Sequence, residues 1–262
     1  MSSLPAAQPL DILAIAAHRD DVEQTCGGTL LKAAQGGQHT GILDLTQGEM
    51  GTRGSADDRA REAADAAKIL KVGWRRALDI PDGRVENTYE NRLKVATVIR
   101  ETRPRVVILP YWKGRHPDHY TASVLGYEAC FLAGLAKLEL ALSSQPSAVS
   151  QTQVVKETSL LAPHRPFKIV YSALYANVTP SFVVDISAQF ERRMAALFCY
   201  ASQYGAGDAG SDLFPHQDEI RERLGSIARF YGNLIGVRYG EPFVVKETMR
   251  VDDLVALPVR SI

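Results

Sequence analysis

The chain has 262 residues, of which 45% are hydrophobic, enough to bury one large core, and we expect a single domain spanning 1–262. Its 30 basic and 30 acidic residues balance, which excludes the broad positive surface typical of a nucleic-acid-binding protein. No apolar run approaches the roughly 18 residues of a membrane span, and residues 1–10 carry no basic segment. The three cysteines, Cys26, Cys130 and Cys199, form no pairing motif. These features predict a cytoplasmic protein with a small-molecule partner, no nucleic-acid partner and no membrane partner.

The first half of the chain alternates apolar runs with helical patterns. Such alternation predicts right-handed crossovers and a mostly parallel sheet. If the first four strands lie in the order 3-2-1-4, strands one and four are neighbours at the switch point, where ligands bind beyond the carboxyl ends of the strands. The predicted strands are 12–17, 40–46, a short one ending at 78–80, and 106–109; the predicted helices are 29–34, 55–72 and one from 88 that stops at 103.

The second half continues with less regular signals. A helix is expected over 120–135, and the polar segment 137–166 is typical of a surface loop or flap. Further along we expect strands at 167–171 and 181–186, a helix over 187–204, a loop at 205–212, a helix over 218–234 and a last strand at 243–245. The predicted fold class is α/β, a Rossmann-like, mostly parallel sheet with helices on both faces.

Two charge-dense turns each follow an apolar strand. The first reads Ala17-His18-Arg19-Asp20-Asp21, and the second, about a hundred residues later, reads Arg115-His116-Pro117-Asp118-His119. One His before two Asp more often forms a solvated helix cap, but two such turns at neighbouring strand ends favour a metal site. A catalytic zinc ion takes three protein ligands, and His18, Asp21 and His119 suit that role, although spacing alone leaves Asp20 and Asp21 as competitors. Fe²⁺ fits the same ligands.

The remaining polar groups of these turns suit a hydrolase. The carboxylate that does not bind the metal can act as general base, and His116 can act as general acid or oxyanion donor. Asp118 can hold an imidazole through its second nitrogen. The interpretation requires His18 and His119 to lie within roughly 6 Å of each other, given metal bonds of ~2 Å.

Both motifs resemble those of the LmbE-like (PIG-L) zinc deacetylase family, whose pattern reads His-Pro-Asp-Asp-x-Glu and then His-Pro-Asp-His. Within the family the chain looks most similar to the N-acetylglucosaminyl-malate deacetylases of bacillithiol synthesis, through residues 44–54 and 236–243. Arg19 stands where the family usually has Pro. The resemblance implies that Asp21 binds the metal, that Asp20 is the base and that the chain forms a homo-oligomer, for which the apolar segment 254–257 offers a contact.

Three further residues are candidates for substrate contacts. Arg53 lies on a glycine-rich loop after the second strand, where a guanidinium would pair with the carboxylates of malate; the alternative is an exposed loop arginine. Tyr200 resembles a family tyrosine that donates to the acetyl oxyanion, but its periodicity alone indicates only an aromatic on a helix face. Arg165 is a candidate sugar contact.

The function predicted from the resemblance is removal of the N-acetyl group from N-acetylglucosaminyl-malate by a zinc-activated water with Asp20 as base. One rival is a deacetylase of another N-acetylglucosaminide, namely free N-acetylglucosamine, a mycothiol-type inositol glycoside or an antibiotic precursor. The other rival is a non-catalytic zinc- or sugar-binding protein, whose metal would have a closed shell of four ligands.

Overall fold

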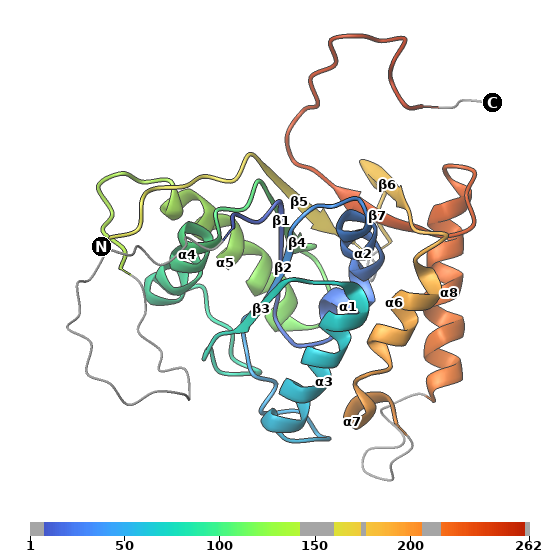
Figure 1. The fold of residues 1–262 in the computed structure, drawn as a ribbon, viewed down its shortest axis with the longest axis horizontal. Helices are drawn as coiled ribbons and strands as arrows, with labels where there is room; N and C mark the ends of the chain where they lie inside the picture. The colour runs from blue at the N-terminus through green and yellow to red at the C-terminus, as the bar shows by residue number, and fades with distance from the viewer. Residues whose placement is uncertain (1–7, 142–159, 174–176, 206–215, 260–262) are drawn as a thin grey trace.

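A computed structural model describes residues 8–141, 160–173, 177–205 and 216–259 of the chain. One seven-stranded sheet runs through these residues in the order β3-β2-β1-β4-β5-β7-β6 (Figure 1). The strands are β1 (Ile12–Ala16), β2 (Thr40–Asp44), β3 (Trp74–Ala77), β4 (Val106–Pro110), β5 (Lys168–Ser172), β6 (Phe182–Asp185) and β7 (Gly240–Val244). The predicted order 3-2-1-4 of the first four strands is confirmed.

The strands from β3 to β5 are parallel, whereas β7 pairs antiparallel with both β5 and β6. The sheet is therefore mostly parallel, as predicted, with a two-stranded antiparallel extension at one side. Because β1 and β4 are direct neighbours, their carboxyl ends meet at the same edge of the sheet. That edge carries both charge-dense turns.

Helices cover both faces of the sheet, and the two faces of β1 show how the sequence specifies this (Figure 1). Leu13 and Ile15 pack in a core shared with α4 and α5, whereas Ala14 and Ala16 pack in a core with α1 and α2. Successive strand side chains point to opposite faces, so an uninterrupted apolar run fits a strand buried on both sides. The helices are α1 (Asp21–Thr25), α2 (Gly27–Gln35), α3 (Ala56–Leu70), α4 (Tyr89–Thr102), α5 (Pro117–Ala133), α6 (Phe190–Leu197), α7 (Ala201–Tyr204) and α8 (Gln217–Asn233).

Helix starts follow their capping residues. The Ser55 hydroxyl accepts from the N–H of Asp58, and the Asp58 side chain accepts from Ser55, which is a capping box at the start of α3. Thr88 caps α4 in the same way by accepting from Asn91 N–H. For α2 the cap comes from far along the chain: the Glu241 carboxylate on β7 accepts from the N–H groups of Gly28 and Thr29 at 2.9 and 2.7 Å.

Three boundaries differ from the prediction. Pro117 suits the first position of a helix, so α5 begins there instead of at Tyr120 and takes His119 into its first turn. The helix expected over 187–204 is interrupted between Leu197 and Ala201, which leaves α6 and the short α7. β3 ends at Ala77, before the expected 78–80. Most of the polar segment 137–166 and of the loop 205–212 falls outside the described residues.

Within the described ranges, no helix has both the length and the apolar character that crossing a bilayer would require.

Candidate active site

The two turns converge on a cavity of about 720 Å³ at the carboxyl edge of the sheet. His18 follows β1 and His119 lies in the first turn of α5, directly after β4 and its loop. The His18 Nδ1 and His119 Nε2 atoms are 3.2 Å apart. This separation is well inside the roughly 6 Å limit for sharing one ion.

Asp21 places a carboxylate against both imidazoles. Its Oδ2 is 3.4 Å from His18 Nδ1, and its Oδ1 is 3.1 Å from His119 Nε2. Ligand atoms on a tetrahedral ion with bonds of ~2.0–2.2 Å lie about 3.3–3.6 Å from each other. Two ring nitrogens and one carboxylate, packed at nearly these separations beside a cavity, therefore fit a divalent metal ion of the zinc type.

The second nitrogen of His18 is held by two further carboxylates. His18 Nε2 lies 3.0 Å from Asp82 Oδ1 and 3.4 Å from Asp118 Oδ2. Asp118 is itself fixed because it accepts from Gly83 N–H and Val85 N–H at 2.8 and 3.2 Å. Carboxylates that take the Nε2–H of His18 leave Nδ1 as the lone-pair nitrogen, which is the one that faces Asp21 and His119.

Other groupings of ligand atoms also occur at this place. His18, His116 and His119, and separately His18, Asp82 and Asp118, bring their ligand atoms within 4.8 Å of one another. Only the set with Asp21 places a carboxylate directly against the two facing ring nitrogens. We therefore retain His18, Asp21 and His119 as the candidate ligands.

Charges in this cluster depend strongly on one another. Burial alone lowers the pKa of His18, but its bonds with Asp118, Asp21 and Asp82 outweigh burial and raise that pKa to about 12. In the same way burial lowers the pKa of His119, but the charge and the hydrogen bond of Asp21 together raise it above its usual value. Burial raises the pKa of Asp21, yet the charge of His119 holds this pKa well below its usual range. Without a metal, the proton that the raised pKa holds on His18 supplies a positive charge at this place.

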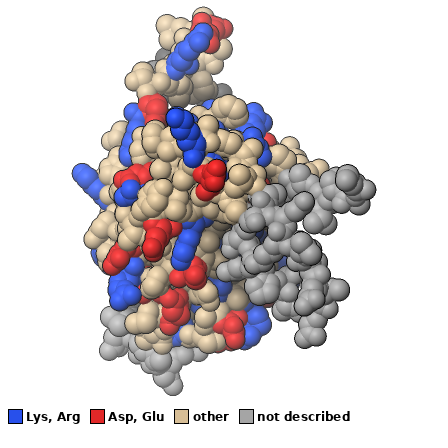
Figure 2. All heavy atoms as spheres, turned by 90° about the vertical axis from the view of Figure 1, so that its left-hand side faces the viewer, with Lys and Arg blue, Asp and Glu red and all other residues tan. Residues whose placement is uncertain are grey.

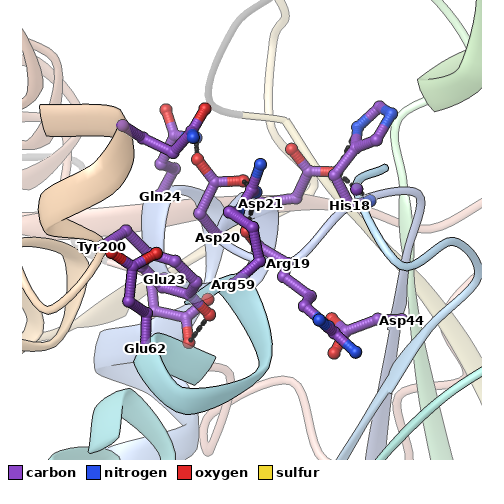
Figure 3. Close-up of polar contacts among 12 residues, drawn as sticks. His18, Arg19, Asp20, Asp21, Glu23, Gln24, Asp44, Arg59, Glu62 and Tyr200 are labelled. Carbon is purple, nitrogen blue, oxygen red and sulfur yellow. Dashed lines mark hydrogen bonds and ion pairs between the residues drawn. The ribbon is translucent and has the colours of Figure 1, made fainter. Parts of the chain in front are cut away.

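Asp20 lies next to this cluster and is held in a constrained position (Figure 3). Its φ of 129° is rare for a residue with a side chain, and such strain concentrates at functional sites. Its Oδ2 accepts from Tyr204 Oη at 2.5 Å and its Oδ1 from Arg59 Nη2 at 3.2 Å. Burial raises the pKa of Asp20 to about 6, because it outweighs the opposing charge of Arg59. A carboxylate of this kind is ionised at neutral pH and is also a better base than usual.

His116 is exposed at the start of α5 and lines the cavity. Its ring centroid lies 4.8 Å from that of His18 and 4.9 Å from that of His119. Because Nδ1 accepts from the N–H of Asp118 at 3.2 Å, the proton of the neutral ring resides on Nε2. Burial and the neighbouring charges of His18 and His119 lower the pKa of His116, so this ring is neutral at pH 7.

Two tyrosines follow α6, and the one that lines the cavity is Tyr204, for which the sequence predicted no role. Tyr200 is completely buried and donates to Glu23 Oε1 at 3.2 Å, whereas the cavity is lined by Tyr204. The predicted oxyanion contact therefore does not fit the place of Tyr200. The interruption after Leu197 turns the chain between the two residues, and uninterrupted helical periodicity cannot anticipate that turn.

Neither of the two arginines proposed for substrate contacts lines the cavity. The cavity is lined by Met50, Gly51 and Thr52 of the glycine-rich loop, but Arg53 is not among its lining residues. Arg165 stacks over the Phe131 ring at 5.0 Å. Phe131 comes twelve residues after His119 in α5, which is about 18 Å along a helix.

Three residues of the site could not be recognised as site residues from the sequence. Asp82 sits in a Pro-Asp-Gly turn after β3, and only the knowledge that a third strand ends at this edge would have drawn attention to it. Arg59 is one of several charged residues along α3. Arg19, which replaces the usual Pro, is buried and donates to the carbonyl of Ala56 at 2.7 Å, so it ties the first turn to the start of α3.

A Rossmann-like sheet with imidazoles and carboxylates converging at its carboxyl edge is the layout of a metal-dependent hydrolase. Comparisons with known proteins narrow this class. A family model described as PIG-L, GlcNAc-PI de-N-acetylase, matches residues 13–130. The chain is 32% identical to diacetylchitobiose deacetylase of Thermococcus kodakarensis over 241 residues, which cover 88% of this chain and 80% of the relative. The chain therefore belongs to the PIG-L (LmbE-like) family of metal-dependent N-deacetylases.

Two further similarities agree with this placement. The 1D-myo-inositol 2-acetamido-2-deoxy-alpha-D-glucopyranoside deacetylase of Kineococcus radiotolerans is 26% identical, over 75% of this chain and 69% of that protein. The crystal structure of the conserved protein TT1542 from Thermus thermophilus superposes with a TM-score of 0.76 at 37% identity, covering 93% of this chain and 98% of that one. The family, the fold and the deacetylase class predicted from the sequence are confirmed. The two named activities given above belong to a diacetylchitobiose deacetylase and an inositol glycoside deacetylase, so the narrower resemblance to bacillithiol enzymes stays a prediction.

Proposed function

We propose that this protein hydrolyses the N-acetyl group of an N-acetylglucosaminide with a divalent ion, in the first place zinc, held by His18, Asp21 and His119. The observation that carries the proposal is the close approach of these three side chains, at 3.1–3.4 Å, beside a cavity that also contains Asp20. When bound at such a site, an ion of this type polarises an amide carbonyl and lowers the pKa of water from ~15.7 toward ~7.

The protein's own groups supply the proton transfers. Asp20 accepts the proton of the attacking water, and Tyr204 and Arg59 fix its two oxygens for that task. His116 carries its proton on Nε2 and donates from there, either to the oxygen that becomes negative or to the departing amine. None of the three cysteines lies in a nucleophile motif, so no covalent intermediate on the protein is required.

The test is acetate release from a panel of N-acetylglucosaminides by the purified protein, before and after chelation and after return of zinc or Fe²⁺. We expect acetate release that is lost with chelation and restored by one of the two ions. A protein that binds the ion tightly but releases no acetate from any member of the panel would instead be the non-catalytic rival.

We also propose that the aglycone is malate, as the sequence resemblance indicated. Basic residues that line the cavity, instead of Arg53, would bind its carboxylates. Lys113, Arg115 and Arg223 line the cavity and are exposed, and none of them forms an ion pair within the described part of the chain. Unpaired cations at the mouth of a site favour a substrate that carries carboxylates.

Paired substrates test this finer proposal. For N-acetylglucosaminyl-malate, we expect the double variant Arg115→Ala/Arg223→Ala to raise KM about tenfold or more, since ~1.4 kcal/mol corresponds to a factor of ten. Diacetylchitobiose should show little change because it has no carboxylate. Arg53→Ala is the comparison variant, and a smaller effect is expected from it. Equal losses on both substrates would contradict an acidic aglycone while leaving the deacetylase proposal intact.

A further inference from the structure

The glycine-rich loop after β2 and the turn after β3 hold each other by two hydrogen bonds. The N–H of Met50 donates to Asp82 Oδ2 at 3.0 Å, and the N–H of Asp82 donates to Glu49 Oε1 at 2.8 Å. Each segment therefore supplies one backbone donor and one carboxylate acceptor. We call this pair of bonds the loop clasp, and its members are Glu49, Met50 and Asp82.

One end of the loop clasp reaches the candidate metal site. The other oxygen of Asp82, Oδ1, lies 3.0 Å from His18 Nε2. Asp82 thus has one oxygen on the ring of a candidate ligand and the other on the backbone of the loop. A carboxylate with both oxygens engaged cannot turn freely, so the loop helps to fix the side chain that orients His18.

The other end of the loop clasp belongs to the cavity wall, because residues 50–52 line the cavity. The same loop also lies against Arg59, since a Cβ at Gly48 would come within 3.2 Å of Arg59 Nη1. Arg59 in turn bonds Asp20, the candidate base. The loop is therefore seated on side chains that hold a ligand and the base, while part of it faces the space for substrate.

Glu49 is the member of the loop clasp that neither lines the cavity nor contacts a candidate ligand. Exposed acidic side chains are common on this protein, and on the face that Figure 2 shows they are interspersed with basic ones. Glu49 is exposed too, but within the described ranges it forms no ion pair, and its carboxylate accepts from the backbone of Asp82 instead. A charged acceptor on a backbone N–H makes a strong hydrogen bond, which suits a residue that positions another.

We propose that Glu49 is a positioning residue of the deacetylase site. Through the loop clasp it fixes Asp82, and Asp82 fixes both the His18 ring for the metal and the loop for the substrate. The inference rests on the proposed function for its effect on substrate, but its effect on the metal is measurable without any turnover.

The first experiment measures the zinc affinity of the metal-free protein by competition with a chromogenic chelator. We expect Glu49→Met to weaken zinc binding about threefold to tenfold, less than the roughly 10–100-fold that follows loss of a group in direct contact with a ligand. Glu49→Gln keeps an oxygen that accepts from the Asp82 N–H, so it should restore most of the affinity. Parent-level affinity in Glu49→Met, or equal losses in both variants, would overturn the proposal.

The matched control for these variants is Glu86→Met. Glu86 is an exposed glutamate in the same connection between β3 and α4 as Asp82, and within the described residues its side chain forms no ion pair. We expect this variant to bind zinc like the parent chain. A loss of affinity equal to that of Glu49→Met would show that any missing negative charge near the site has this effect, and the proposal would be wrong.

A double variant tests whether the effect passes through Asp82. Asp82→Ala should weaken zinc binding about tenfold or more, because His18 Nε2 then keeps only Asp118 of its two carboxylate partners. Adding Glu49→Met to Asp82→Ala should cause no further loss if both residues act by one route. Losses that multiply would contradict that route. Circular dichroism spectra check that each variant is folded.

Steady-state kinetics with zinc in excess test the substrate side. We expect Glu49→Met to raise KM for an N-acetylglucosaminide about threefold or more while kcat stays within a few-fold, since the loop contacts the substrate before and during the reaction alike. A merely structural role would change neither constant per folded molecule, so an unchanged KM would overturn the role of Glu49 in placing the loop. A parent chain that releases no acetate would refute the proposed function instead, and the zinc affinities would still decide the role of Glu49.

Discussion

Two clusters of charged and polar side chains meet at the short helix α1, which carries both Asp21 and Glu23, and Figure 3 labels members of both clusters. The cavity cluster contains His18, Asp20, Asp21 and His119. The sealed cluster contains Glu23, Asp44, Arg75 and Tyr200, and none of these residues lines the cavity. Asp21 and Glu23 are two positions apart, so they point to different sides of the helix. One short segment thus contributes a carboxylate to each cluster.

The clusters differ in how their charges are satisfied. In the sealed cluster Arg75 bonds both oxygens of Asp44 at 2.9 and 3.0 Å and Glu23 Oε1 at 2.7 Å, so a cation of the chain itself pairs with both carboxylates. In the cavity cluster Asp21, Asp82 and Asp118 surround the His18 ring, and neutrality requires either protons or a bound cation. Carboxylates paired with a cation of the chain itself indicate a structural role, whereas carboxylates left for an added cation indicate a metal site.

The largest effect is expected from removing a candidate ligand. His119→Ala should abolish metal retention and lower acetate release about a thousandfold or more, because the activation of water depends on the ion. Metal analysis of the purified variant beside its turnover checks this. His39→Ala is the control, since that side chain is 57% exposed and remote from the cavity, and it should behave like the parent chain. A His119→Ala variant that kept a full equivalent of metal would remove this residue from the ligand set.

The next largest effect distinguishes the roles of the two adjacent carboxylates, Asp20 and Asp21. Asp20→Asn should lower kcat by about 10²–10⁴, the usual contribution of a positioned base, while the metal content stays at the parent level. Asp21→Asn, one residue later, should lose metal as well. Measuring both variants for bound metal and kcat decides the assignment that spacing alone left open. Normal turnover by Asp20→Asn would rule out Asp20 as the base.

The sequence could predict the parts of this site that depend on regular strands and helices. Apolar runs locate β1 and β4, and the strand order brings His18 and His119 together, because parallel strands end at one edge. Tyr204 could not be distinguished from Tyr200, since their difference depends on a local break in the helix. Asp82 reaches the site through the path of a loop, which residue patterns do not encode.

Arg53 and Arg165 illustrate a different limit of prediction from the sequence, the direction of an exposed side chain. Each lies in a segment whose place in the chain could be predicted, but the direction of an exposed side chain depends on nearby contacts. Arg165 contacts the ring of Phe131 and therefore lies at the end of α5 that is remote from the cavity. The glycine-rich loop reaches the cavity with residues 50–52, just short of Arg53.

In the sealed cluster we expect a loss of stability with little change in chemistry. Arg75→Met leaves Asp44 and Glu23 buried without their cation and should cost about 3–5 kcal/mol of unfolding free energy. Its kcat per folded molecule should stay within a few-fold of the parent value. Arg76→Met, on the same strand, breaks a more exposed pair with Glu101 and should cost less than about 1 kcal/mol. Urea unfolding compares the two variants, and a catalytic defect in Arg75→Met without loss of stability would refute the division between the clusters.

The smallest effect is a release of protons on metal binding, and it belongs to the cavity cluster alone. His18, with a pKa raised to about 12, is protonated in the metal-free protein at neutral pH, so an entering ion must displace that proton. Calorimetric zinc titrations in buffers of different ionisation enthalpy should therefore report at least one proton released per ion, and the affinity for zinc should rise with pH.

Protonated His18 also stabilises the metal-free protein. This stability is fully present below the unfolded pKa of 6.5 and is lost as the pH rises toward 12. Alkaline pH therefore weakens the metal-free fold while it favours metal binding. Arg75→Met, folded under the same conditions, should release the same number of protons, and a changed number would show that the two clusters are electrostatically one.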